Sequence, residues 1–201
     1  MQRVLAFDVG QRDLGCCLVD RLPDGSTFRV IDWDVLDLGP GPVRLAVSGF
    51  CGLVHRWWRG CTAVDICVIE QQTNVNKKML ALSHAIQAAV CVHSPHTQVV
   101  FASPKTILPR ATTVDVQSPY RRKKARKENS IRVATALLAS DPEHASWLEL
   151  LQNARAGIKD DLADSLLYAV APISPTTLAR SPSTCNSSAA AADDDGPSDG
   201  N

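Results

Sequence analysis

Acidic residues stand at three places in the sequence where the neighbouring residues are apolar. Asp8 follows the apolar run Val4-Leu-Ala-Phe7, and Glu70 follows the run Ile66-Cys-Val-Ile69. A third group, Lys159-Asp-Asp-Leu-Ala-Asp-Ser165, contains three acids within five positions. An ionised carboxylate beside apolar residues is costly unless its charge is compensated. Asp8 or Glu70 alone could simply be the first polar residue of a loop, but the three places together indicate chemistry.

The third group has the spacing of one helix face. Successive helical residues turn by about 100°, so Asp161 and Asp164 lie about 60° apart, and Asp160 and Asp164 about 40° apart. Either pair could project together. A plainer interpretation is that acids in a first helical turn interact favourably with the helix dipole. That interpretation accounts for Asp160 or Asp161, but not for Asp164, which lies among apolar residues.

Four carboxylates that converge would raise one another's pKa unless a cation is present. Hard oxygen ligands of this kind suit Mg²⁺ or Mn²⁺. Two such ions, about 3.5–4 Å apart, can activate a water, orient a phosphate and stabilise the leaving oxygen of a displacement. The sequence therefore predicts a two-ion site that hydrolyses a nucleic-acid backbone.

Buried strands must position the first two acids. The runs before Asp8 and Glu70 are short, apolar and continuous, which is typical of central strands. Two more strands are predicted at Leu14–Val19 and Thr27–Trp33, forming an antiparallel meander with the first. A strand, a long crossover and a second strand favour parallel pairing, so Asp8 and Glu70 should lie at the same edge of the sheet.

The remaining elements complete an α/β domain with a mixed five-stranded sheet flanked by helices. Another strand is expected at Gln98–Ala102. Apolar residues recur at helical spacing within four ranges: 43–57, Lys77–Val92, Ile131–Leu138 and Ile158–Val170. We predict one nuclease domain over residues 1–173. The tail, residues 174–201, is rich in Pro, Ser, Ala and Asp and is predicted to be disordered.

The composition indicates a cellular compartment but no particular binding partner. The chain has 201 residues, with 21 Lys and Arg against 21 Asp and Glu, so net charge indicates no partner. Its seven cysteines are odd in number and lie mostly in apolar runs, which is typical of buried reduced thiols. No signal peptide or membrane segment is evident, and we expect no membrane partner. We expect a reducing intracellular compartment, without distinguishing nucleus, mitochondrion or viral replication site.

A basic run, Tyr120-Arg-Arg-Lys-Lys-Ala-Arg-Lys127, precedes the acidic helix and is predicted to lie in a loop leading into a helix. Such runs are often solvated loops or nuclear-localisation signals. Beside a carboxylate site, the run is better interpreted as a phosphate clamp that binds DNA with little regard to sequence. The candidate DNA-binding residues in it are Arg121, Arg122, Lys123, Lys124, Arg126 and Lys127.

Three motifs resemble those of the RuvC-type Holliday junction resolvases, especially the mitochondrial and poxvirus-like branch, within the ribonuclease H-like superfamily. They are Asp8-Val-Gly10 with Gly15, then Val68-Ile-Glu-Gln-Gln72, then Lys159–Ser165. The resemblance covers Met1 to Pro172 and implies a ribonuclease H-like fold. It makes four carboxylates the catalytic metal ligands, namely Asp8, Glu70, Asp161 and Asp164. Because the last motif begins with a doublet, Asp160 stays open as an alternative ligand.

The resemblance also implies an active-site or phosphate-contacting lysine, for which Lys105 and Lys127 both fit. It implies an Mg²⁺-dependent endonuclease that resolves four-way DNA junctions by paired nicks, as a homodimer whose interface could include Lys77–Val92. One alternative is an RNA-processing nuclease of the same superfamily, whose first motif can be identical. Another is an actin-like nucleotide-binding protein, which normally needs a second domain that this chain has no room for.

Overall fold

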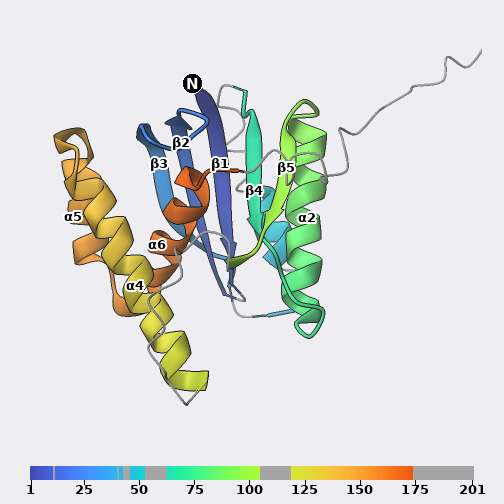
Figure 1. Ribbon diagram of the computed structural model, residues 1–201. Coiled ribbons are helices and arrows are strands. Elements are labelled where there is room, and N and C mark those ends of the chain that lie inside the picture. The colour runs from blue at the N-terminus through green and yellow to red at the C-terminus, as the bar shows by residue number, and fades with distance from the viewer. Residues whose placement is uncertain (11, 40, 43–45, 53–62, 105–118, 174–201) are drawn as a thin grey trace, which may run out of the picture.

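Five strands form one mixed sheet at the centre of the molecule (Figure 1). The computed structural model describes residues 1–10, 12–39, 41–42, 46–52, 63–104 and 119–173. The strands are β1 (Gln2–Val9), β2 (Asp13–Arg21), β3 (Phe28–Asp37), β4 (Ile66–Glu70) and β5 (Gln98–Ala102). Their order across the sheet is β3-β2-β1-β4-β5. The predicted mixed sheet is confirmed.

The strand pairing brings two of the predicted acids to one edge. β1 pairs antiparallel with β2, which pairs antiparallel with β3, so the meander is confirmed. β1 is parallel to β4, with Phe7 opposite Ile69, and β4 is parallel to β5. Asp8 and Glu70 each stand one residue beyond that matched pair. They therefore lie next to each other at the carboxyl ends of adjacent strands.

Successive side chains of a strand point to opposite faces of the sheet, which determines the face on which these acids lie. Val4, Ala6, Ile66 and Val68 belong to a core cluster with the apolar residues of α6 (Ala156–Val170). The intervening strand residues belong to a second cluster, shared with α2 (Lys77–His93). Side chains two positions apart on a strand share a face. Asp8 and Glu70 therefore lie on the α6 side of the sheet.

Helices flank both faces of the sheet (Figure 1). Helix α2 covers β4 and β1 on one side. The other side carries α6, with α4 (Pro119–Ala139), the short 3₁₀ helix η1 (Pro142–His144) and α5 (Ala145–Asn153) beside it. Residues 46–52 are helical, and the rest of the helix predicted over 43–57 lies outside the described residues. None of the helices described is long and apolar enough to cross a membrane.

In the second half of the chain one prediction is wrong and one helix was not predicted. The basic run was expected in a loop, yet it forms the first turns of α4, which is 21 residues long. Arg, Lys and Ala are good helix formers, and proline is well suited to the first helical position, so the helix begins at Pro119 rather than near Ile131. Helix α5 was not predicted. Its signal is the apolar spacing of Ala145–Asn153, and the 3₁₀ helix η1 directly before it is capped by Asp141.

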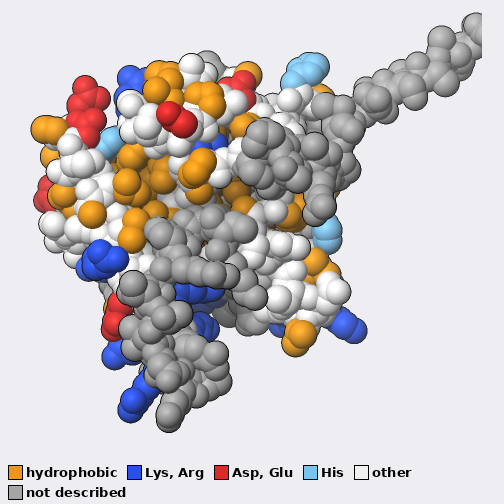
Figure 2. Space-filling model, in the orientation of Figure 1, with side chains coloured by type: hydrophobic (Ala, Val, Ile, Leu, Met, Phe, Trp, Pro, Cys, Tyr) orange, Lys and Arg blue, Asp and Glu red, His pale blue; other side chains and the backbone are white. Residues whose placement is uncertain are grey.

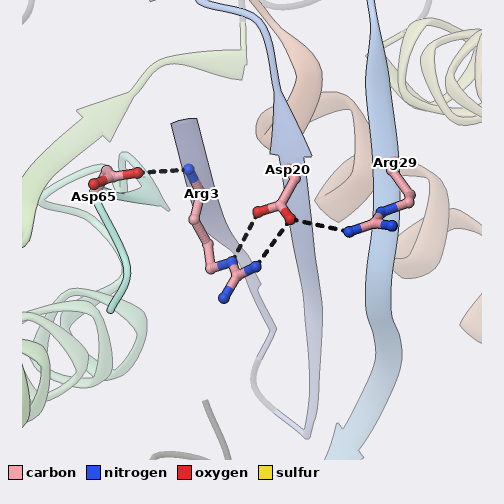
Figure 3. A network of polar contacts seen from close by, with 4 residues as sticks. All are labelled: Arg3, Asp20, Arg29 and Asp65. Atoms are coloured by element: carbon pink, nitrogen blue, oxygen red, sulfur yellow. Dashed lines mark hydrogen bonds and ion pairs between the residues drawn. The ribbon is translucent and has the colours of Figure 1, made fainter. Parts of the chain in front are cut away.

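The end of the sheet opposite Asp8 is held by charged residues (Figure 3). The Arg3 guanidinium donates two hydrogen bonds to the Asp20 carboxylate, at 2.8 and 2.9 Å, and Arg29 lies 3.5 Å from the same carboxylate. The hydrogen bonds from Arg3 lower the pKa of Asp20 below its ordinary value. The backbone N–H of Arg3 donates to Asp65 at 2.7 Å. These contacts tie β1, β2 and β3 together away from the candidate site.

The expectation of buried free thiols is confirmed for three of the five described cysteines, whereas Cys51 is exposed and Cys91 is half-buried. Cys16, Cys17 and Cys67 are buried in the sheet and unpaired. Burial raises the pKa of all three thiols, which keeps them protonated and unreactive. The reducing compartment stays a prediction, as does the disorder of residues 174–201, which lie outside the described part of the chain.

Candidate active site

Asp8 and Glu70 form the base of the candidate site. They lie side by side at the ends of adjacent parallel strands, and both side chains are partly buried. Burial, then repulsion by Glu70 and by Asp164, raises the pKa of Asp8 well above its ordinary value. Two carboxyls in contact can share a proton or a cation, but they repel each other when both are ionised and alone. This pair therefore favours positive charge nearby.

Glycine at position 15 lets α6 approach these acids. Gly15 lies opposite Asp8 in the β1–β2 pair. A Cβ atom added to Gly15 would be 2.4 Å from the carbonyl oxygen of Asp161 and 3.3 Å from the Cβ of Asp8. Any larger residue would push the helix away. Gly15 therefore brings the backbone of Asp161 close to Asp8, which explains why this glycine accompanies the first motif.

Two buried polar side chains hold α6 in place along its length. The indole Nε1 of Trp33 donates to the carbonyl of Leu162 at 3.0 Å and to Oγ of Ser165 at 3.1 Å. The guanidinium of Arg21 donates to the carbonyls of Val170 and Ala171, at 3.2 and 2.7 Å. These are carbonyls at the C-terminal end of the helix, which otherwise lack partners there. The position of the acids on α6 is thus fixed from both β2 and β3.

The three acids of α6 have different neighbours. Asp164 and Asp161 both repel Asp8, so both lie close to it. Asp160 is 4% exposed and forms an ion pair with Lys127 of α4. The helix begins at Ala156, which places Asp160 and Asp161 in its second turn. The helix-dipole explanation is therefore wrong, since that effect fades within the first turn.

Asp161 occupies a mixed electrostatic environment. Its pKa is raised to about 6, mainly by burial; Lys127 lowers it, and repulsion by Asp13, Asp164 and Glu70 adds to the rise. Asp161 therefore belongs to the same charge cluster as Asp8 and Glu70. Asp160 is neutralised by its own lysine instead. Between the two members of the doublet, the geometry brings Asp161 into the acid cluster.

Lys127 is the predicted lysine that the structure places beside the acids. Its side chain is 38% exposed, and it contacts Asp160 while lying close enough to Asp161 to lower the pKa of that group. Lys105 lies outside the described residues. Lys127 therefore joins α4 to the acidic helix, within reach of the carboxylate cluster.

The N-terminal half of α4 presents basic side chains at the same end of the molecule. Figure 1 shows this part of the helix extending beyond the sheet, and Figure 2 shows Lys and Arg side chains gathered there. The exposed ones are Arg121, Lys123, Lys124 and Arg126. The side chain of Arg122 lies outside what the structure describes. In sequence these residues run directly up to Lys127.

Two residues of the cluster were missed from the sequence. The side-chain amide of Gln72 donates a 2.7 Å hydrogen bond to Oε2 of Glu70. Asp13, the first residue of β2, raises the pKa of Asp161 by repulsion. The signal for Gln72 was its position two residues after Glu70, because alternate residues of an extended segment share a face. Nothing in the local pattern distinguished Asp13 from a loop residue.

The donor chemistry of the site fits a hard divalent cation. Asp8, Glu70, Asp161 and Asp164 supply only carboxylate oxygens, the type that Mg²⁺ and Mn²⁺ prefer. A cation would also relieve the repulsion that raises the pKa values of Asp8 and Asp161. Within the described ranges, no group of three or more His, Cys, Asp or Glu side chains is already drawn together as a ligand set. The ligand types therefore fit a divalent cation, although the carboxylates do not yet lie close enough together to form a ligand set.

Solved structures of two resolvases resemble the whole domain. Thermus thermophilus RuvC in complex with a Holliday junction substrate matches with a TM-score of 0.54 and 17% identity, over 85% of this chain and 91% of that chain. Fowlpox virus resolvase in complex with Holliday junction DNA matches with a TM-score of 0.57 and 16% identity, over 84% of this chain and 95% of that chain. No protein-family model and no curated protein matches the sequence. The predicted fold, the ribonuclease H-like fold of RuvC-type resolvases, is confirmed.

Proposed function

We propose that this chain is a divalent-metal-dependent endonuclease that resolves four-way DNA junctions by paired nicks. The proposal rests on the placement of Asp8 and Glu70 at the carboxyl ends of adjacent parallel strands, with Asp161 and Asp164 on the helix that packs against the same face, in a RuvC-like fold. The two structural relatives were solved with Holliday junctions, which supports branched DNA as the substrate. The actin-like alternative is disfavoured, since the described residues form one sheet and no duplicated domain.

The four carboxylates are the residues that would hold Mg²⁺ or Mn²⁺, with two ions expected. When bound, such ions supply positive charge that polarises the phosphate and activates water. Glu70 and Asp8 provide the fixed part of this site on the rigid sheet, and α6 provides the rest. Asp160 is the less favoured ligand, because its charge is already matched by Lys127.

Lys127 would bind a phosphate oxygen of the substrate beside the carboxylates. Its amine is held by Asp160 and is still 38% exposed, so it keeps access to a ligand. A lysine at this place offsets the negative charge that the acids would otherwise present to DNA. Lys105 stays a prediction for the same role.

Basic residues on both sides of the carboxylates support a path for the DNA backbone. One group is the exposed basic face of α4. On the other side Lys77 and Lys78 are exposed in the first turn of α2, at the same end of the sheet (Figures 1 and 2). Contacts of this kind give affinity that depends on salt and reads no base sequence. Such binding suits a substrate recognised by its branched shape.

Paired nicks require two sites, because a four-way junction has approximate two-fold symmetry. A homodimer would supply them. Helix α2 is the proposed interface, as expected from the sequence. Its outward side bears exposed small or apolar residues at helical spacing, Ala81, Ala88 and Val92, and Val92 is 77% exposed.

The proposal is tested by offering one set of substrates side by side. The wild-type chain is incubated in Mg²⁺ with a synthetic four-way junction, a linear duplex of the same sequence, an RNA–DNA hybrid and a structured RNA. We expect symmetric nicks in the junction and little cutting of the duplex. Preferential cutting of either RNA substrate would overturn the proposal in favour of the RNA-processing alternative.

A further inference from the structure

Gln72 contacts Glu70 through a geometry that the backbone prepares. The N–H of Gln71 donates to the carbonyl of Ala102 at 2.8 Å, which continues the β4–β5 pairing one residue beyond Glu70. The chain therefore stays extended, and alternate side chains point to opposite sides. Gln72 returns to the face of Glu70 and is half-buried, whereas Gln71 is exposed.

The hydrogen bond from Gln72 limits how Glu70 can turn. Its amide nitrogen lies 2.7 Å from Oε2 of Glu70, which is a short distance for a donor to a carboxylate. A carboxylate offers about four acceptor positions on its two oxygens. One is occupied by Gln72, and Asp8 lies beside Glu70 at the end of the adjacent strand. The hydrogen bond from Gln72 therefore limits the rotation of Glu70 and leaves acceptor positions for a cation.

A neutral donor is well suited to this place. A lysine or arginine would fix Glu70 equally well, but its charge would compete with the cation for the same carboxylate. An amide orients the oxygen and leaves its negative charge available. Partners that orient metal ligands in this way change metal affinity or activity by about 10- to 100-fold when they are removed.

We infer that Gln72 is a positioning residue, which orients Glu70 for a divalent cation. The inference rests on the proposed function, because it assumes that Glu70 is a metal ligand. Gln72 itself need not touch the metal or the DNA. Its effect should therefore appear in metal affinity, and much less in the cutting rate once metal is saturating.

The test compares Gln72→Met with Gln71→Met. Methionine has about the length of glutamine and no donor, so each variant removes an amide without leaving a large gap. Gln72→Ala is a second variant of the same residue. Binding of Mn²⁺ to each protein is measured by the electron paramagnetic resonance of the free ion, with thermal unfolding in EDTA as a check of folding. Junction cutting is then followed as a function of Mg²⁺ concentration.

We expect both Gln72 variants to bind Mn²⁺ about 10-fold or more weakly, and to need correspondingly more Mg²⁺ for half-maximal cutting. Gln71→Met should match the wild type. Equal Mn²⁺ affinity in Gln72→Met and wild type would overturn the inference, as would equal weakening in Gln71→Met. If the wild type binds Mn²⁺ and cuts junctions, these outcomes leave the proposed function standing. A wild type that neither binds Mn²⁺ nor cuts would overturn both.

Discussion

Asp161→Asn should make the metal-free protein more stable, although it removes a residue proposed to be essential. Asp161 has a pKa of about 6 in the fold, mainly because it is buried, against an ordinary value of 3.8. The folded state therefore binds this proton more tightly than the unfolded state does. The resulting penalty is absent below about pH 4 and complete above about pH 6, so stability falls as pH rises through this window. Asparagine has the same shape and carries no charge.

The size of the effect follows from the pKa. A rise from 3.8 to about 6 corresponds to about 3 kcal/mol, at about 1.4 kcal/mol for each factor of ten. The side chain is partly exposed, and solvent screening reduces the expected gain to about 1–2 kcal/mol. For a chain of this length that is a rise in Tm of about 2–8 °C. The gain should appear at pH 8 in EDTA and vanish near pH 4.

Asp160→Asn is the matched control, because it is the same substitution one residue earlier. Asp160 is buried and paired with Lys127, so its loss leaves that lysine without its partner and should lower stability. Urea unfolding of both variants and the wild type, in EDTA at pH 8, measures the two effects. Opposite signs are expected. If Asp161→Asn is destabilised as much as Asp160→Asn, the argument that burial and neighbouring acids destabilise the ionised Asp161 carboxylate is refuted.

Three further predictions concern stability and the approach of α6. Mg²⁺ should stabilise the wild type by about 2.7 kcal/mol at one hundred times its Kd, and should leave Asp8→Asn nearly unchanged in a thermal scan; equal stabilisation of both would place the cation elsewhere. Lys127→Met should lower the free energy of unfolding by about 2–3 kcal/mol, because it leaves the buried Asp160 carboxylate without its partner. The control Lys124→Met loses only an exposed ion pair with Glu128 at 3.9 Å, so it should change the free energy of unfolding by less than about 1 kcal/mol. Gly15→Ala should lower stability by about 1–3 kcal/mol and slow junction cutting, because its Cβ would meet the Asp161 carbonyl at 2.4 Å; Gly49→Ala, with nothing within 4 Å, should do neither.

The strands and the first two acids could be predicted because their signals are local. A short apolar run ended by one acid indicates a buried strand and its end, and the crossover between two such runs indicates parallel pairing. The face that Asp8 and Glu70 share follows from alternation. The sequence motifs then added α6 as the third contributor, and the structure brings Asp161 and Asp164 to Asp8.

Contacts between elements distant in sequence could not be predicted in the same way. The doublet of Asp160 and Asp161 looked equivalent in sequence, and only the packing of α4 against α6 turns Asp160 towards Lys127. The role of Gly15 also depends on a helix almost 150 residues later. The basic run forms a helix and not the predicted loop, because its Arg, Lys and Ala residues have high helix propensity in spite of their charge.

The most direct test of the central claim is the rate of four-way junction cutting by wild type and by Asp8→Asn in Mg²⁺. The account predicts that the wild type nicks the junction, and that Asp8→Asn binds the same junction but cuts it at least about 100-fold more slowly, as expected when one of the proposed metal ligands is lost. Equal cutting by the two proteins would contradict the assignment of the acids around Asp8 as the active site.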